Sequence, residues 1–331
     1  MRNACCVALL VLSAAAGTAQ SVGLSVKGDS VQVNGQSRFL VGVSLFDALG
    51  TTAPSDRDLD ALAAWHMSLV RVWAHWNQPI YGHDGRLTGS GRRRLLEFAK
   101  RLERRHVVLE VVLLRPGQLP GQSFAWLDSA KARTTAVTEI AITLKPFRLV
   151  LFDLFNEHDH PSGGVSHAEA RELRDAVKRV DPGRLVTLSS TEYHIVSGDA
   201  TIGVVGARNL WSEACETSGS VGVDVVEPHL PRTSDWARTV GKRIRALQTA
   251  MKEQGCTRPI LLNEERRAQD DEHPIPAAEY WTAAREAKDA GAAGWLFHTK
   301  AGFDLARRPF LESLSREERR ALDGLAGSLE R

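Results

Sequence analysis

Eight short apolar runs, each followed by a segment with helical periodicity, constrain the fold of this 331-residue chain most strongly. The runs are rich in Val, Leu and Ile, and most of them lack the polar–apolar alternation of a strand that faces water. They therefore predict parallel strands that are buried on both faces. These predicted strands span residues 39–46, 68–73, 107–114, 148–155, 184–190, 221–228, 259–263 and 292–298.

The segments between the apolar runs predict amphipathic helices. One stripe, with steps of three or four residues, consists of Trp236, Val240, Ile244, Leu247 and Met251. Ser55 and Ser166 are expected to cap the N-termini of two helices. Gly219, Gly255 and Gly291 are expected at the ends of three others, because glycine adopts the left-handed conformation there at little cost.

Eight strands that alternate with eight helical segments predict a single α/β domain over residues 20–331, a closed (β/α)8 TIM barrel. The competing fold is a doubly wound open sheet that binds a nucleotide. It needs a Gly-rich turn after the first strand, and residues 43–50 read VSLFDALG instead. A short β-hairpin is expected before the barrel, because apolar and polar residues alternate over residues 24–33 around a Gly-Asp turn.

The first nineteen residues have the features of a signal peptide. Arg2 precedes an apolar stretch over residues 7–16, and small residues follow at 17–19. The stretch is too short to span a bilayer, so we expect a secreted or periplasmic protein with no membrane partner. Cleavage would leave two cysteines, Cys215 and Cys256, which an exported protein could join; the sequence leaves this open.

Composition excludes two classes of protein. Hydrophobic residues make up 43% of the chain, which argues against a disordered protein. Lys and Arg number 42 against 40 Asp and Glu, so the chain lacks the basic excess of a nucleic-acid-binding protein. It has no CxxC or HExxH pattern, and we predict neither a metal nor a cofactor.

Polar side chains stand where several predicted strands end. Asn156 and Glu157 follow the fourth strand, Glu264 follows the seventh, His229 follows the sixth, and Arg71 lies within the second. Catalytic groups of such barrels lie at the carboxyl ends of the strands. Two carboxylates on nearly opposite sides of one barrel mouth are the arrangement that cleaves a glycosidic bond.

These residues give the chain a resemblance to the clan A glycoside hydrolases, nearest to the cellulase/mannanase family, family five. The resemblance covers about residues 24–300, from the hairpin with its Asn-Gly turn through Leu-Val-Gly-Val on the first strand to Val-Arg-Val on the second. It implies a retaining hydrolase of β-linked oligo- or polysaccharides, with Glu157 as acid/base and Glu264 as nucleophile. Retention in turn predicts a separation of about 5–5.5 Å between the two carboxyl groups.

Four departures from the family pattern indicate a divergent member. His158 replaces a usual Pro, and Leu230-Pro231 stands where a Tyr usually follows the sixth-strand His. Arg115 ends the third strand where a His is common, and His298 stands near a usual Trp. The alternative function is therefore a catalytically weak or inactive barrel that only binds carbohydrate.

Two adjacent acids compete for the nucleophile's role. Glu264 stands five residues after Pro259, the interval found in the clan, and Glu265 follows it directly. Because side chains alternate along a strand, only one of them should point into the mouth. We prefer Glu264 and expect Glu265 to pair with an Arg such as Arg266.

The remaining candidate residues have both a binding and a structural interpretation. Arg71 could hold the nucleophile ionised or form a buried ion pair with Asp153 or Glu110. Asn156 could hydrogen-bond a sugar hydroxyl, and His229 is a candidate substrate contact. Candidates for an aromatic sugar platform, each equally consistent with a place in the core, are Trp73, Trp76, Trp295 and His298.

Overall fold

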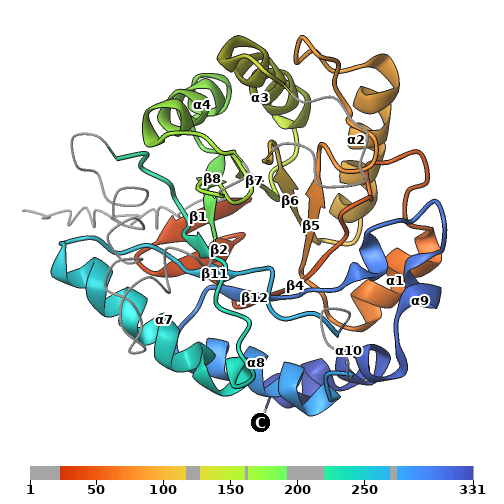
Figure 1. The fold of residues 1–331 in the computed structure, drawn as a ribbon, viewed down its shortest axis with the longest axis vertical. Coiled ribbons are helices and arrows are strands. Elements are labelled where there is room, and N and C mark those ends of the chain that lie inside the picture. Colours follow the sequence, from red (N-terminus) through yellow and green to blue (C-terminus); the bar gives the residue numbers. More distant parts are fainter. Residues whose placement is uncertain (1–22, 117–126, 161–162, 192–219, 269–273, 331) are drawn as a thin grey trace, which may run out of the picture.

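The structure is a computed structural model, and it describes residues 23–116, 127–160, 163–191, 220–268 and 274–330. The fold is α/β: a parallel sheet curls around the centre of the molecule, and helices surround it (Figure 1). Seven strands are hydrogen-bonded in the order β11-β12-β4-β5-β6-β7-β8. Their bounds are β4 Leu40–Ser44, β5 Leu69–Trp73, β6 Val108–Val112, β7 Val150–Asp153, β8 Leu185–Thr187, β11 Leu261–Leu262 and β12 Gly294–Phe297.

Two short strands lie between the edges of this sheet. Strand β9 (Ser189–Ser190) follows β8 directly and pairs in parallel with β10 (Glu227–Pro228). Val226, just before β10, forms a parallel bridge with Ile260, just before β11. Each of the eight predicted apolar runs thus contains a strand, in the expected order.

The helices lie outside the strands (Figure 1). Their bounds are α1 Asp56–Ala64, α2 Gly89–Glu103, α3 Ala130–Leu144, α4 His167–Val180, α7 Trp236–Glu253, α8 Ala277–Asp289, α9 Phe310–Ser313 and α10 Arg316–Leu329, with a 3-10 turn, η2, at Lys300–Gly302. The predicted stripe of α7 is buried along its whole length. An amphipathic helix of this kind is stabilised mainly by packing its apolar face on the strands.

The predicted helix ends are confirmed where the structure describes them. The side chains of Ser55 and Ser166 accept hydrogen bonds from the backbone of the first turns of α1 and α4. Gly255 and Gly291 follow α7 and α8 with φ values of 71° and 79°. Gly219 lies outside the described residues.

A small antiparallel sheet precedes the parallel strands. It consists of β1 (Leu24–Lys27), β2 (Ser30–Val33) and β3 (Gln36–Ser37). Val31 of β2 is 2% exposed, and it shares an apolar cluster with residues at the amino ends of the parallel strands, including Leu40, Leu69 and Val108. The hairpin therefore covers the end of the curled sheet opposite the candidate catalytic residues.

Two further features concern export and membranes. The predicted signal peptide and Cys215 lie outside the described residues, whereas Cys256 is disulfide-bonded. In the described part of the chain, no helix combines the length and the apolar character that crossing a membrane requires.

Candidate active site

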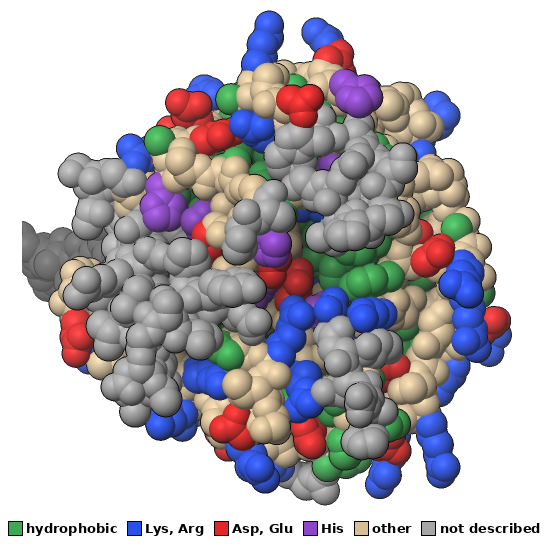
Figure 2. Space-filling view, in the orientation of Figure 1, with side chains coloured by type: hydrophobic (Ala, Val, Ile, Leu, Met, Phe, Trp, Pro, Cys, Tyr) green, Lys and Arg blue, Asp and Glu red, His purple; other side chains and the backbone are tan. Residues whose placement is uncertain are grey.

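A pocket of about 410 Å³ opens at the carboxyl ends of the parallel strands. Asn156 and Glu157 after β7, His229 after β10 and Glu264 after β11 all line it. Acidic, basic and His side chains gather around the hollow at the centre of this face (Figure 2). The structure thus brings together four of the predicted site residues, and Trp76 after β5 is a fifth member of the lining.

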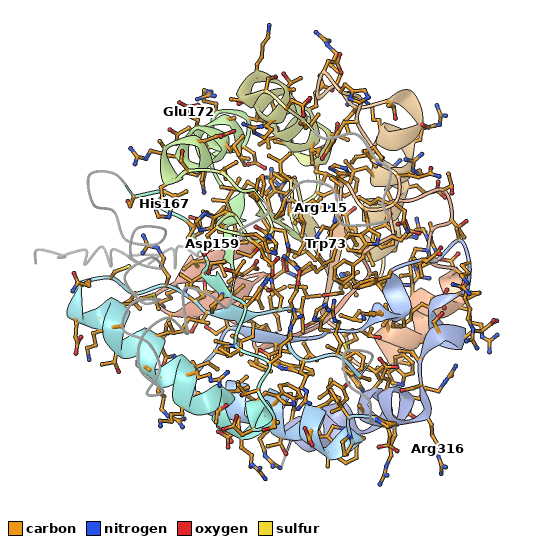
Figure 3. All side chains as sticks on the ribbon, viewed as in Figure 1. Trp73, Arg115, Asp159, His167, Glu172 and Arg316 are labelled. Carbon is orange, nitrogen blue, oxygen red and sulfur yellow. The ribbon has the colours of Figure 1, made fainter. Side chains whose placement is uncertain are left out.

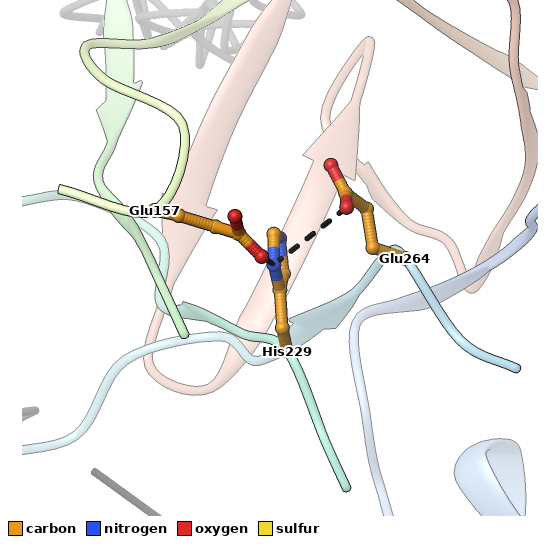
Figure 4. A group of neighbouring side chains, drawn as sticks. All are labelled: Glu157, His229 and Glu264. Atoms are coloured by element: carbon orange, nitrogen blue, oxygen red, sulfur yellow. Dashed lines mark hydrogen bonds and ion pairs between the residues drawn. The ribbon is translucent and has the colours of Figure 1, made fainter. Parts of the chain in front are cut away.

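Glu157, His229 and Glu264 converge on one point of the pocket (Figure 4). The nearest ligand atoms of the three side chains all lie within 4.8 Å of one another. His229 Nδ1 lies 3.0 Å from Glu157 Oε1 and 3.9 Å from Glu264 Oε2, so the imidazole contacts both acids. Two carboxylates this close are suited to act on one bond of one substrate.

Both glutamates have an unusual backbone conformation. Glu157 and Glu264 each follow an Asn at the end of a strand, and their φ values are 50° and 51°. Residues other than glycine rarely adopt positive φ, and such strain concentrates at functional sites. The side chains of both glutamates line the pocket.

Arg71 lies beneath Glu264 and fixes its position. Its guanidinium, which is fully buried, donates to Glu264 Oε1 at 2.8 Å, Glu110 Oε1 at 2.6 Å and Asp153 Oδ2 at 2.8 Å. It also donates to Asn156 Oδ1 at 2.9 Å. Both interpretations of Arg71 therefore hold in the geometry: it forms a structural ion pair and it contacts the candidate nucleophile.

These charges determine the ionisation of the site. Burial alone would raise the pKa of Glu264, but the positive charges of His229 and Arg71 outweigh it and bring the pKa well below its ordinary value. Burial alone would lower the pKa of His229, but the carboxylates of Glu264 and Glu157 raise it overall. Both shifts favour the ionised carboxylate of Glu264 and the protonated imidazole of His229, the charge state that a carboxylate nucleophile requires.

A second group of acids lies deeper between the strands. The nearest oxygens of Glu110, Asp153 and Glu227 lie within 4.8 Å of one another, and all three side chains are fully buried. Burial raises the pKa of Glu110 to about 7 against the charge of Arg71, and it raises that of Glu227 together with the nearby acids. Arg71 cannot neutralise three buried carboxylates and Glu264, so protons must compensate part of this charge.

Two sets of described side chains could hold a metal ion. Glu157, His229 and Glu264 offer two carboxylates and an imidazole, and Glu110, Asp153 and Glu227 offer three carboxylates. In both sets arginines already contact carboxylates: Arg71 contacts Glu264, Glu110 and Asp153, and Arg232 Nη2 lies 3.5 Å from Glu264 Oε2. These contacts favour proton chemistry over metal ligation at the pocket.

Two candidates for the sugar platform do not line the pocket and take the core position that the sequence left open. Trp295 is fully buried, and its indole packs at 6.4 Å from Phe297 in the core that contacts the helices. His298 is also fully buried, and its Nδ1 contacts the Glu265 carbonyl at 2.7 Å. Neither residue lines the pocket, because one points outward from β12 and the other lies beneath the pocket's aromatic side chains.

The prediction for Glu265 was that it pairs with an Arg such as Arg266. Arg266 donates to the Thr233 carbonyl at 3.4 Å, and the charges of Arg243 and Arg232 act on the Glu265 carboxyl group. The Glu265 side chain is 2% exposed, and burial raises its pKa to about 7. Its neighbour Glu264 lines the pocket, which agrees with the prediction that only one of the two acids points into the mouth.

Several pocket residues had no predicted role. Arg115, Arg232 and Arg267 line the pocket together with Phe46 and Phe303. The position of Arg115 at the end of a strand was a signal that could have been used. The others stand in loops after different strands, and only the fold brings them together.

Ser189 also escaped prediction. Its Oγ accepts a hydrogen bond from the Glu157 backbone at 3.1 Å and donates to Asp153 Oδ2 at 2.8 Å. It therefore links the strained turn of Glu157 to the buried acids.

Comparison with solved structures identifies the fold. The β-mannanase from the blue mussel Mytilus edulis superposes over 94% of this chain and 97% of its own, with a TM-score of 0.62 and 17% identity. This chain has the fold of the mannanases and cellulases. The resemblance to the clan A glycoside hydrolases is thus confirmed for the fold, and the low identity fits a divergent member.

Two other solved structures of this mannanase/cellulase fold are similar. The endo-1,4-β-mannanase from Rhizomucor miehei matches 93% of this chain and 100% of its own, with a TM-score of 0.59 and 11% identity. The cellulase XacCel5A, solved with cellopentaose, matches 78% and 88%, with a TM-score of 0.53 and 16% identity. No family model and no curated protein matches the sequence.

Proposed function

We propose that this protein is a retaining glycoside hydrolase that cleaves β-linked oligo- or polysaccharides by double displacement. The observation that carries the proposal is the pair Glu157 and Glu264, whose nearest oxygens lie within 4.8 Å of each other across one pocket. This separation is close to the 5–5.5 Å of retaining enzymes and well below that of inverting ones, which must fit a water molecule between the carboxyl groups.

The first step forms a glycosyl-enzyme intermediate. A Glu264 oxygen bonds to the anomeric carbon while the bond to the leaving oxygen breaks, and Glu157 gives its proton to that oxygen. In the second step Glu157 takes a proton from water, the water oxygen bonds to the anomeric carbon, and the bond to Glu264 breaks. The two steps balance without any cofactor.

The neighbouring side chains support these roles. Arg71 and His229 keep Glu264 ionised, and His229 also contacts Glu157 at 3.0 Å, where it can orient the carboxyl group. Asn156 is held by Arg71 at 2.9 Å with its amide at the pocket, where it can hydrogen-bond a sugar hydroxyl. Trp76 is the candidate that remains for the sugar platform.

We further propose that β10 completes an eight-stranded barrel, since Val226 bridges to Ile260 and β10 pairs with β9. We also propose that residues 1–19 direct export and are removed, leaving one catalytic domain. N-terminal sequencing of protein recovered outside the cytoplasm tests this second proposal, and a sequence that begins at Met1 contradicts it.

Hydrolysis of a panel of aryl β-glycosides and β-glucans, by the wild type and by Glu157→Gln, tests the proposed activity. We expect the wild type to hydrolyse at least one of them and the variant to lose activity most strongly on substrates with poor leaving groups. Binding of the glycans without hydrolysis by the wild type would instead support a barrel that only binds carbohydrate.

A further inference from the structure

The pocket wall contains more arginine side chains than the recognition of a neutral sugar requires. Besides the two glutamates, Arg115, Arg232 and Arg267 line the pocket, and they stand in the loops that follow three different strands. Among the described residues of the wall, the three guanidinium groups outnumber the two carboxylates, and Glu264 is also paired to Arg71 from beneath.

Two of these arginines are held against aromatic rings. The Arg115 guanidinium carbon lies 4.7 Å from the centre of the Trp76 ring, and that of Arg267 lies 5.5 Å from the centre of the Phe303 ring. The rings of Trp76 and Phe303 contact each other edge to face at 5.0 Å. Arg115, Trp76, Phe303 and Arg267 therefore form one continuous wall, in which two aromatic rings separate two guanidinium groups. In Figure 3, Arg115 is labelled next to Trp73, in the middle of the molecule and inside the surrounding helices.

This wall combines two kinds of recognition. Aromatic rings accept the flat C–H face of a sugar, and Trp76 is fixed for this by a hydrogen bond from its Nε1 to the Phe303 carbonyl at 2.9 Å. A guanidinium stacked on a ring loses little conformational freedom on binding, and its planar donors match carboxylate and sulfate oxygens. A neutral sugar has hydroxyl groups that can accept hydrogen bonds from a guanidinium, but it has no negative charge to pair with it.

The third arginine has a different task. Arg232 Nε donates to the Glu264 carbonyl at 3.1 Å, and its Nη2 lies 3.5 Å from the Glu264 carboxylate. It belongs to the environment of the candidate nucleophile. Arg115 and Arg267 instead stack on the aromatic rings of the wall, and we assign the recognition of a ligand charge to these two.

We propose that the sugar bound in this pocket carries a negative charge, as the carboxylate of a hexuronic acid or as a sulfate ester, and that Arg115 and Arg267 bind it. The inference rests on the proposed function, because it names the substrate class of the same site. It adds a property that separates this pocket from a site for neutral mannan or cellulose.

Matched 4-nitrophenyl β-glycosides test the inference, each pair differing only at carbon 6. The gluco, galacto and manno series are each measured as the neutral hexoside, the hexuronide and the 6-sulfate. We expect kcat/KM for one charged form to exceed that for its neutral partner at least tenfold in at least one series. The preference should weaken between 0.05 and 0.5 M NaCl, because salt screens the attraction. The series also shows whether carboxylate or sulfate is preferred.

The variants Arg115→Met and Arg267→Met should each lower the charged-to-neutral ratio about tenfold, because each removes a bidentate donor. Arg93→Met, an exposed arginine on α2, is the matched control and should leave the ratio unchanged. Because Arg115 is buried and its variant could fail to fold, the half-buried Arg267 and the salt dependence provide independent readouts. A neutral preference in all three series, or a ratio that neither variant moves, overturns the inference.

A binding measurement separates this inference from the proposed function. Thermal shifts of Glu157→Gln with glucuronate, galacturonate and mannuronate are compared with those with the neutral sugars, and no hydrolysis is needed. A larger shift with an acid supports the inference even if no glycoside is cleaved. Equal shifts overturn it, while hydrolysis of neutral glycosides would leave the proposed function intact.

Discussion

Glu264 differs from Glu265 in its surroundings, although the two residues are adjacent. Glu264 lines the pocket and contacts Arg71 at 2.8 Å, whereas burial raises the pKa of Glu265 to about 7. We expect Glu264→Ala to lower kcat by on the order of a thousandfold or more, since removal of a nucleophile blocks both chemical steps. Azide should restore part of the turnover with inverted product, detected by NMR.

Glu265→Ala is the matched comparison for that experiment. It should retain activity and lose mainly stability, because it empties a buried position. An inactive Glu265→Ala together with an active Glu264→Ala would show that the strand register proposed for β11 is wrong by one residue.

His229 sets the charge that both candidate carboxylates experience. Its imidazole contacts Glu157 at 3.0 Å and lies 3.9 Å from Glu264, and its positive charge helps to lower the pKa of Glu264. In His229→Asn that charge is lost, so the pKa of Glu264 rises and the nucleophile is protonated at a higher pH. We expect the acidic limb of the kcat/KM profile to move to higher pH.

The control for this variant is His106→Asn. His106 is exposed and has a φ of 55°, a conformation that Asn also tolerates. Its pH profile should match the wild type. If the acidic limb of His229→Asn also stays in place, the imidazole does not hold the charge assigned to it.

Among the elements, the β1–β3 hairpin has a structural task that is separate from catalysis. Val31 is 2% exposed and packs against the amino ends of the parallel strands. This end of the curled sheet lies away from the pocket. Val31→Ala should lower the free energy of unfolding by about 1.5 kcal/mol, measured by urea denaturation. KM should not change.

Gln36→Ala, an exposed substitution on β3, is the control and should stay within about 0.5 kcal/mol of the wild type. If Val31→Ala costs no more than Gln36→Ala, the hairpin is not part of the core.

The elements were also the most predictable part of the molecule from sequence. All eight apolar runs contain a strand, because burial on both faces leaves a strong compositional signal. The same burial removes the alternation that would tell which face of β12 points inward. This is why the sequence could not decide between the pocket and the core for Trp295, which packs in the core on the side of the helices.

Only those site residues that directly follow a predicted strand could be identified from the sequence. Glu157, Glu264, Asn156 and His229 stand one or two residues after the predicted apolar runs, and the curled sheet brings the carboxyl ends of these runs together. Arg232 and Arg267 stand two or more residues beyond those ends, in loops whose paths have no local signal. The left-handed turns at Glu157 and Glu264 were equally invisible, because an Asn-Glu pair does not require positive φ.

For the whole molecule, the buried acids predict a pH-dependent stability. Glu110 has a pKa of about 7 in the folded protein, raised by burial from an ordinary value of 4.5. Between these values the folded protein holds a proton that the unfolded chain releases. The free energy of unfolding should therefore fall as pH rises from about 4.5 to 7, by up to about 1.4 kcal/mol per pH unit for one proton.

Glu110→Gln should flatten this dependence, because the amide cannot ionise. Urea denaturation at pH 5, 6, 7 and 8 measures the slope, and Glu253→Gln at the exposed end of α7 is the matched control. An unchanged slope in Glu110→Gln would mean that Glu110 does not carry this proton.

Trapping the covalent intermediate tests the central claim most directly. A 2-deoxy-2-fluoro glycoside with a good leaving group, built on the sugar that the wild type hydrolyses best, slows both steps and allows the glycosyl-enzyme to accumulate. We predict that the intact mass increases by one fluorosugar and that peptide mapping places it on Glu264. A sugar on Glu265, or no adduct together with products of inverted configuration, would contradict the account.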